Sequence, residues 1–340
     1  MDVALGLDTF GDVTVDLEGR RLSQAQVLRN TVDQIVHADQ VGVDAIGVGE
    51  HHRDDFAVSA PEIVLAAAAG RTERILLGTA VTVLSSDDPV RVFEKFATLD
   101  GVSGGRVEIQ IGRGSFTESF PLFGYDLADY EILFEEKLDL LTQLLNEKPV
   151  TWSGRTRASL TDADVFPKTE NGIRTWIGVG GSPESVVRAA KYGHPMMLAI
   201  IGGPPERFAP FADLYRRALA EMGRDVLPVG VHSPGHVGAT DAEARDELFP
   251  HFKANRDRIG RERGWGPATR EQFEAEVDHG ALFVGSPETV AQKIAATVKT
   301  LGLSRFDLKY ANGTMPHEQL MDSIGRYGTE VIPQVRELLA

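Results

Sequence analysis

Apolar runs typical of buried strands alternate with helical patterns along the whole chain. Strands are expected near residues 3–8, 43–49, 75–83, 105–111, 174–179, 195–200, 227–234 and 304–309. Helices are expected near residues 23–40, 61–72, 89–100, 128–147, 183–192, 205–222, 287–301 and 317–338. The helical pattern is clearest from Tyr130 to Leu145, where apolar residues three or four apart mark one face.

The strict alternation of strand and helix predicts a parallel sheet covered by helices, because strands that are apolar on both faces need cover on both. Eight such units predict a closed (β/α)8 TIM barrel, with residues 1–340 forming a single α/β domain. An open doubly wound sheet is the alternative fold. It is disfavoured because no Gly-x-Gly-x-x-Gly follows the first strand.

Two segments are too long to be ordinary loops. These insertions, after strands 4 and 7, span about residues 149–172 and about residues 238–285. The second contains helical stretches of its own. Long insertions on a barrel usually form lids or substrate walls, and oligomer contacts are the alternative.

The acidic composition narrows the choice of partners. The chain has 35 Lys+Arg against 50 Asp+Glu, and its formal net charge is −15. Such a surface repels nucleic acid and anionic membranes, so neither is an expected partner. The absence of cysteine excludes disulfides, thiolate nucleophiles and Cys-ligated zinc. The N-terminus lacks a signal-peptide pattern and no apolar run could span a bilayer, so we expect a soluble cytoplasmic protein.

Reactive side chains gather where the predicted strands end, which is where barrel enzymes place their chemistry. Asp8 ends the first strand and Glu50-His51-His52 ends the second. Arg113 follows the fourth strand between two glycines, and His232 lies at the end of the seventh. Four of the nine histidines lie at these ends, namely His51, His52, His232 and His236. The sequence therefore predicts an active site at this end of the barrel.

The segment after the fifth strand predicts an anion site. Gly180 and Gly181 allow backbone amides to approach a ligand, and Ser182 and Ser185 open the next helix, whose N-terminus favours negative charge. Arg113 would supply a bidentate cation for the same group, most plausibly one phosphate. The alternatives are an ordinary helix start capped by Ser182 and an arginine held in a structural salt bridge.

The histidines allow more than one interpretation. In Glu50-His51-His52, a general base or a hydrogen-bond donor to a ligand is favoured. A metal site would need both imidazoles on one face, but adjacent strand residues point to opposite faces, so we assign no metal ligand. A Glu–His pair that fixes the loop is a further alternative. His232 faces inward if Val229 and Val231 pack outward, and a structural histidine is its alternative.

Taken together, these motifs resemble those of the bacterial luciferase-like family of flavin-dependent monooxygenases and oxidoreductases. The resemblance covers nearly the whole chain and rests on the order and spacing of several motifs. Family members are (β/α)8 barrels with an insertion after the seventh strand. The motifs that carry the resemblance are Gly49-Glu50-His51-His52, Gly78-Thr79-Ala80, Gly112-Arg113-Gly114, the segment from Trp176 to Ser182, and the tail from Met315 to Pro333.

The resemblance implies where a cofactor and the catalytic residues lie. Arg113 and the 180–185 segment would bind the phosphate of FMN, and the isoalloxazine would stack over the third strand. A non-prolyl cis peptide of the family would here join Ala80 to Val81. His51 matches the family's catalytic histidine and His232 approximately matches a histidine near the flavin. With Glu50, they are the candidate catalytic residues.

The resemblance also implies a reaction. Reduced FMN, supplied by a separate NAD(P)H-dependent flavin reductase, would react with dioxygen to give a C4a-peroxyflavin that attacks a small organic substrate. A homodimer packed through helices of the first barrel half is expected. The main alternative is a deazaflavin-dependent enzyme that transfers hydride without oxygen. A metal-dependent barrel hydrolase and a non-catalytic flavin-binding protein are further alternatives.

Overall fold

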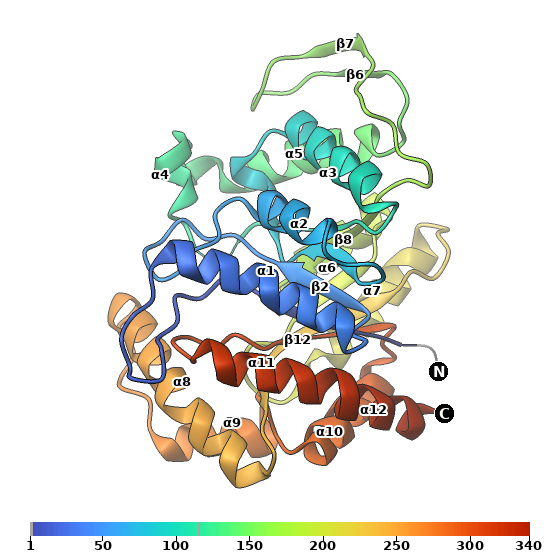
Figure 1. The fold of residues 1–340 in the computed structure, drawn as a ribbon. Helices are drawn as coiled ribbons and strands as arrows, with labels where there is room; N and C mark the ends of the chain where they lie inside the picture. The colour runs from blue at the N-terminus through green and yellow to red at the C-terminus, as the bar shows by residue number, and fades with distance from the viewer. Residues whose placement is uncertain (1–2, 115) are drawn as a thin grey trace.

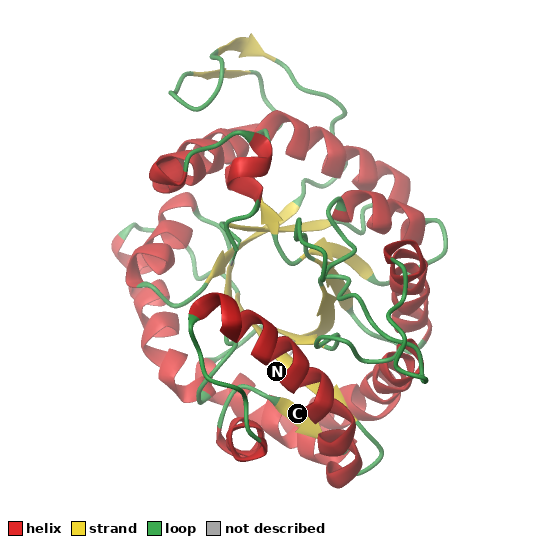
Figure 2. Cartoon of the chain, turned by 90° about the vertical axis from the view of Figure 1, so that its left-hand side faces the viewer, coloured by secondary structure: helices red, strands yellow, loops and turns green. Residues whose placement is uncertain are grey.

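A ring of parallel strands forms the centre of the computed structural model, which describes residues 3–114 and 116–340 (Figure 2). The strands are hydrogen-bonded in the order β3-β2-β1-β12-β10-β9-β8-β5-β4, and a bridge between Leu77 and Val107 joins β3 to β5 and closes the ring. The predicted TIM barrel is therefore confirmed. Its strands are β1 (Ala4–Thr9), β2 (Ala45–Val48), β3 (Leu76–Thr79), β4 (Thr82–Val83), β5 (Glu108–Gly112), β8 (Arg174–Val179), β9 (Met196–Ala199), β10 (Val229–Val237) and β12 (Arg305–Lys309).

The third strand of the barrel is interrupted. The sequence predicted one strand over residues 75–83, but β3 and β4 are separated by a cis peptide bond between Ala80 and Val81. The predicted cis bond is thus present. Neighbouring glycines make room for it: a Cβ atom on Gly47 would lie 2.8 Å from that of Ala80, and one on Gly112 would lie 2.6 Å from the side chain of Val81.

Helices surround the strands (Figure 1). Several of them begin with a side-chain cap, for example Ser23 before α1 and Asp88 before α3. The predicted helix at 205–222 is a short 3₁₀ turn followed by α7, and the predicted helix at 317–338 is divided by a π-helical turn at Tyr327–Val331. The main helices are α1 (Gln24–Gln40), α2 (Pro61–Ala69), α3 (Pro89–Ser103), α5 (Tyr130–Leu144), α6 (Pro183–Tyr192), α7 (Ala209–Glu221), α10 (Pro287–Leu301), α11 (His317–Arg326) and α12 (Ile332–Leu339).

The interior of the barrel is polar. Arg305 forms ion pairs with Asp307 on its own strand and with Glu108, whose Oε1 lies 2.9 Å from Nη2 of the arginine. Gln110 donates to Asp307 at 3.3 Å. Burial raises the pKa of Asp307 to about 6, against the lowering effect of Arg305. Paired charges therefore fill the barrel where many barrels carry branched apolar side chains.

The first insertion forms an antiparallel hairpin, β6 (Val150–Trp152) and β7 (Leu160–Ala163), on the outer side of α5. Trp152 donates to Asp139 of α5 at 2.9 Å, and Arg157 pairs with Asp88 at 2.9 Å. Figures 1 and 2 show the hairpin outside the ring of helices. It does not line the mouth of the barrel, so the structure does not support a lid or substrate wall at residues 149–172, and the oligomer contact stays a prediction.

The second insertion contains the predicted helices, α8 (Asp241–Arg263) and α9 (Arg270–His279). It also contains a strand that was not predicted, β11 (Phe283–Gly285), which pairs with the end of β10 and explains why β10 runs past the predicted residue 234. Across the described residues, no helix is both long and apolar enough to cross a membrane.

Candidate active site

His51 lies in the loop that follows β2 and not on the strand itself, because β2 ends at Val48. Its buried ring is surrounded by three phenylalanines: the ring centroids of Phe10, Phe56 and Phe116 lie 5.0, 4.5 and 4.9 Å away. Its Nδ1 lies 3.3 Å from Oε1 of Glu118. A titratable ring is therefore held in an apolar environment with one carboxylate beside it.

Glu50 and His52 form a separate pair. The carboxylate of Glu50 accepts a hydrogen bond from the backbone N–H of Val83, next to the cis peptide, and its Oε2 lies 3.7 Å from Nε2 of His52. The nearby carboxylate of Glu50 raises the pKa of His52, although burial opposes this. The structure thus contains the Glu–His pair considered from the sequence, and it involves His52 rather than His51.

His232 on β10 is hydrogen-bonded through Nδ1 to the fully buried carboxylate of Asp8 at the end of β1. These two strands are separated by β12, so the contact crosses the inner face of the barrel and His232 points inward as predicted. The ring of Phe10 lies 5.0 Å from His51 and 6.2 Å from His232. The two candidate catalytic histidines therefore flank one phenylalanine.

Arg113 and the start of α6 come together as predicted. Nη2 of Arg113 donates to Oγ of Ser185 at 3.2 Å, and Oγ of Ser182 lies 2.9 Å from the same oxygen. Ser182 is also the N-cap of α6, and Arg113 also pairs with Glu131. The structure therefore shows the capped helix and the salt-bridged arginine, and it brings Arg113 and Ser185 together; phosphate binding by these groups stays a prediction.

The two glycines before α6 differ in what surrounds them. A Cβ atom on Gly180 would meet no other heavy atom within 4 Å, so open space adjoins the group of donors. Gly181 has a φ of +99°, a conformation that favours glycine. Upstream on β8, Gly178 approaches the side chain of Val81. Open space, a guanidinium and a helix N-terminus fit a phosphate group.

Sequence analysis missed Glu118, because its loop bears no motif and only the fold brings it to His51. It also missed Phe10, Phe56 and Phe116, which are spread over three loops. A carboxylate a few residues after Arg113 at the same strand end was the one available signal for Glu118. Within the residues that the structure describes, no cluster of His, Asp and Glu could hold a metal ion.

Comparison with known proteins assigns the family. Residues 9–305 match the family model described as luciferase-like monooxygenase. The chain belongs to this family. It is therefore an enzyme of the luciferase-like flavin-dependent monooxygenases and oxidoreductases. An uncharacterised protein of Sinorhizobium fredii is 30% identical over 94% of this chain and 95% of its own length. The 4-hydroxyprotoasukamycin monooxygenase of Streptomyces nodosus subsp. asukaensis is 29% identical over 73% of this chain and 71% of its own.

Solved structures of the family share the fold. The monooxygenase RslO1 from Streptomyces bottropensis has a TM-score of 0.84 at 23% identity and covers 97% of this chain and 99% of its own. The oxygenating constituent of the Pseudomonas putida 3,6-diketocamphane monooxygenase, a complex with FMN, has a TM-score of 0.78 at 19% identity, with 98% and 99% covered. An F420-dependent secondary alcohol dehydrogenase has a TM-score of 0.76 at 20% identity, with 99% and 100% covered.

Proposed function

We propose that this protein is an FMN-dependent monooxygenase that acts on a small organic substrate with dioxygen. The observation that carries the proposal is the convergence of Arg113, Ser185 and the N-terminus of α6 beside open space. This arrangement suits the phosphate that FMN carries at one end.

The choice of FMN over a deazaflavin rests on the curated relatives. The 4-hydroxyprotoasukamycin relative, which shares 29% identity with this chain, is named a monooxygenase, and this favours a cofactor that activates dioxygen. Reduced FMN, when bound, supplies the electrons that activate dioxygen. Because this chain carries no nicotinamide motif, we assign the supply of reduced flavin to a separate NAD(P)H-dependent reductase.

The remaining roles follow from the contacts of each side chain. Phe10, Phe56 and Phe116 keep water from His51, which favours an apolar substrate there. His51 and His232 hold or transfer a proton at Nε2, because Nδ1 of each ring faces a carboxylate. Glu50 acts indirectly, by fixing His52 and the backbone of Val83.

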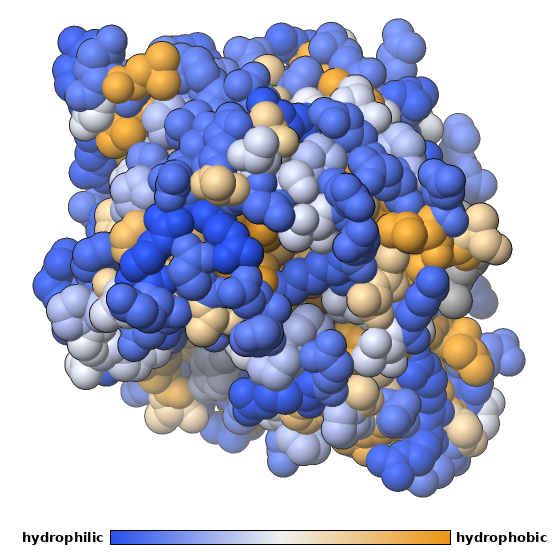
Figure 3. All heavy atoms as spheres, turned by 90° about the horizontal axis from the view of Figure 1, so that it is seen from below, coloured by the Kyte–Doolittle hydropathy of each residue, from blue (hydrophilic) through white to orange (hydrophobic). Residues whose placement is uncertain are grey.

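We also propose a homodimer through α2 and α3. The outer face of α2 consists of Ile63, Ala66 and Ala67, and Ile63 is 67% exposed. On α3, Val102 is 65% exposed. By contrast, the face in Figure 3 is mostly hydrophilic, with apolar residues in small separate groups. Apolar side chains on neighbouring helices favour association there.

An anaerobic titration with reduced FMN, and separately with reduced F420, tests the function. The proposal predicts tight binding of reduced FMN and, when air is admitted, a transient absorbance distinct from that of oxidised flavin. Selective binding of F420 would instead assign the protein to oxygen-independent hydride transfer. Binding of FMN with no reaction with oxygen, and no effect of replacing His51, would favour a non-catalytic flavin-binding protein.

A further inference from the structure

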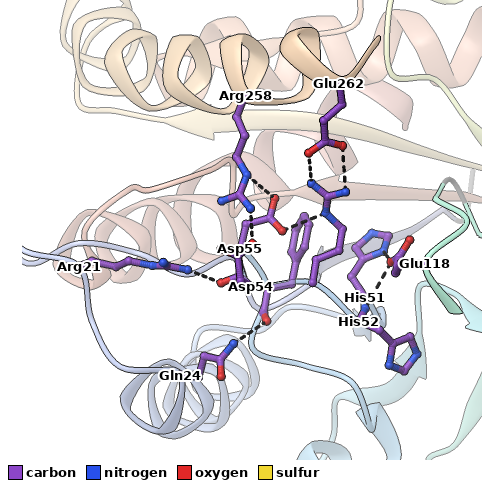
Figure 4. Close-up of polar contacts among 11 residues, drawn as sticks. Arg21, Gln24, His51, His52, Asp54, Asp55, Glu118, Arg258 and Glu262 are labelled. Atoms are coloured by element: carbon purple, nitrogen blue, oxygen red, sulfur yellow. Dashed lines mark hydrogen bonds and ion pairs between the residues drawn. The ribbon is translucent and has the colours of Figure 1, made fainter. Parts of the chain in front are cut away.

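Glu118 is placed to interact with His51 and not with its own helix. It is the N-cap residue of α4 (Ser119–Phe123), yet its side chain makes no capping hydrogen bond. Instead, Oε1 lies 3.3 Å from Nδ1 of His51 and 3.3 Å from the backbone nitrogen of His52 (Figure 4). The carboxylate therefore turns away from the helix N-terminus, where it would be stabilised, and toward the loop after β2.

The charge of Glu118 determines which nitrogen of His51 carries a proton. Burial acts to raise the pKa of the Glu118 carboxyl, but hydrogen bonds from His51, from the backbone N–H of Glu118 itself and from His52, together with the charge of His51, outweigh it and hold the pKa below its ordinary value. At neutral pH the side chain is then a carboxylate, which only accepts hydrogen bonds. Nδ1 of His51 must therefore be the donor, and Nε2 is left to interact with a ligand.

The second carboxylate oxygen of Glu118 makes no contact that would account for a glutamate at this position. Among the described residues, Oε2 is buried and has no hydrogen-bond partner. Burying an unpaired carboxylate oxygen costs free energy, so a side chain selected for folding alone would be better replaced by a smaller or neutral one. Packing of Phe10, Phe56 and Phe116 already restricts the ring of His51 without it.

We propose that Glu118 is a positioning residue: it fixes His51 as the Nδ1–H tautomer and so directs Nε2 toward the substrate. Its catalytic consequence rests on the proposed function, but the tautomer assignment does not. A carboxylate that orients a histidine in this way controls catalysis without touching the reacting atoms.

Nitrogen NMR of the histidine rings in the protein without cofactor tests the tautomer directly. At about pH 8.5, well above the ordinary histidine pKa of about 6.5, the wild-type His51 signal should be that of the Nδ1–H form. In Glu118→Gln the side-chain amide can donate to Nδ1, so the Nε2–H form should grow. Glu262→Gln removes a carboxylate from the same end of the barrel without touching His51, and should leave the tautomer unchanged.

Kinetics gives the second readout. Glu118→Gln should lower kcat about 10- to 100-fold, part of the usual general acid–base contribution, with KM changed by less than about twofold. A wild-type His51 in the Nε2–H form would overturn the proposal even if the variant failed to fold. So would an unchanged tautomer in a folded Glu118→Gln protein. If the enzyme has no monooxygenase activity but the tautomer responds, the proposed function fails and the role of Glu118 stands.

Discussion

The guanidinium of Arg113 lies between a carboxylate, Glu131, and the start of α6 at Ser185. If a phosphate binds there, Arg113→Ala should weaken FMN binding by about 1.5–3 kcal/mol, the scale of a charged hydrogen bond. Affinity for riboflavin, which lacks the phosphate, should be unchanged. Fluorescence titration of both ligands measures this.

A neighbouring arginine provides the control for Arg113. Arg188 also pairs with Glu131, and its other partner is Glu135 rather than Ser185. Arg188→Ala therefore removes the same charge from the same network. An equal loss of FMN affinity in both variants would mean that general electrostatic attraction, and not a direct contact of Arg113, is responsible.

Gly180 and Gly181, which the sequence treats alike, should respond differently to valine. At Gly180 the new side chain would enter open space, so FMN binding should fall while the melting temperature stays unchanged. At Gly181 the φ of +99° makes valine strained, which should cost about 1–3 kcal/mol of stability as well. Thermal unfolding and FMN titration of both variants separate the effects. Normal FMN binding by Gly180→Val would contradict the phosphate site.

At the scale of single residues, the sequence predicted the site residues that lie in recognisable motifs and missed those that lie outside them. The contact between Arg113 and Ser185 was predictable because glycines flank Arg113 and a capping serine precedes the helix that carries Ser185. The contact of Glu118 with His51 depends on the path of the loop after β5, which no local pattern specifies. His51 and His52 were assigned to opposite faces of a strand, whereas both lie in a loop and share the carboxylate of Glu118.

At the scale of elements, ion pairs connect α8 to the loop that carries His51. Glu262 accepts two hydrogen bonds from Arg53, at 3.0 and 2.6 Å, and Arg258 pairs with Asp54 and Asp55 (Figure 4). The hydrogen bond with Glu262 is the main cause that raises the pKa of Arg53. The end of the second insertion and the loop after β2 are thus coupled by charge.

Breaking this contact should loosen the end of α8. Glu262 is 47% exposed, so Glu262→Gln should cost only about 0.5–1 kcal/mol locally and speed amide exchange in residues 256–263 about two- to fivefold. Hydrogen exchange with mass spectrometry measures this. Asp246→Asn removes a carboxylate that pairs with Arg270 near the other end of α8, and should leave residues 256–263 unchanged. An equal change in both variants would rule out a local contact.

Elements with strong periodicity were predictable, and those defined by tertiary contacts were not. Buried parallel strands are apolar on both faces, so each barrel strand was visible in the sequence. The hairpin of β6 and β7 was missed because its strands are short, and β7 has no buried residue to mark a face. The break between β3 and β4 appeared in the sequence only through the family resemblance.

At the scale of the whole molecule, the closed ring followed from the count of eight units, but the contents of its interior did not. Arg305 and Asp307 lie in a strand pattern that gives no sign of which residues face inward. Only closure of the ring brings Glu108 on β5 to Arg305 on β12. The fold was therefore predictable from local periodicity, while the polar interior required the three-dimensional arrangement.

One partly buried histidine should make the stability of the molecule depend on pH. His194 follows α6, and its Nε2 lies 3.1 Å from the hydroxyl of Thr142 on α5. Burial, helped by the charge of Arg224, lowers its pKa to about 4. In the unfolded chain an ordinary histidine takes up its proton near pH 6.5. Below that pH the unfolded state binds more protons than the folded state, so the stability present above pH 6.5 is lost as the pH falls toward 4.

For this pKa, the loss between about pH 8 and about pH 5 is about 2 kcal/mol of unfolding free energy. His194→Gln keeps a polar partner for Thr142 but cannot take up a proton. Between the two pH values the variant should therefore lose about 2 kcal/mol less unfolding free energy than the wild type. Urea unfolding of both proteins at the two pH values measures the difference, and every other titrating group cancels in the comparison. Parallel losses in the two proteins would show that His194 is protonated in the folded state as readily as in the unfolded chain. The protonated ring of His194 would then be tolerated between α5 and α6, contrary to the lowered pKa.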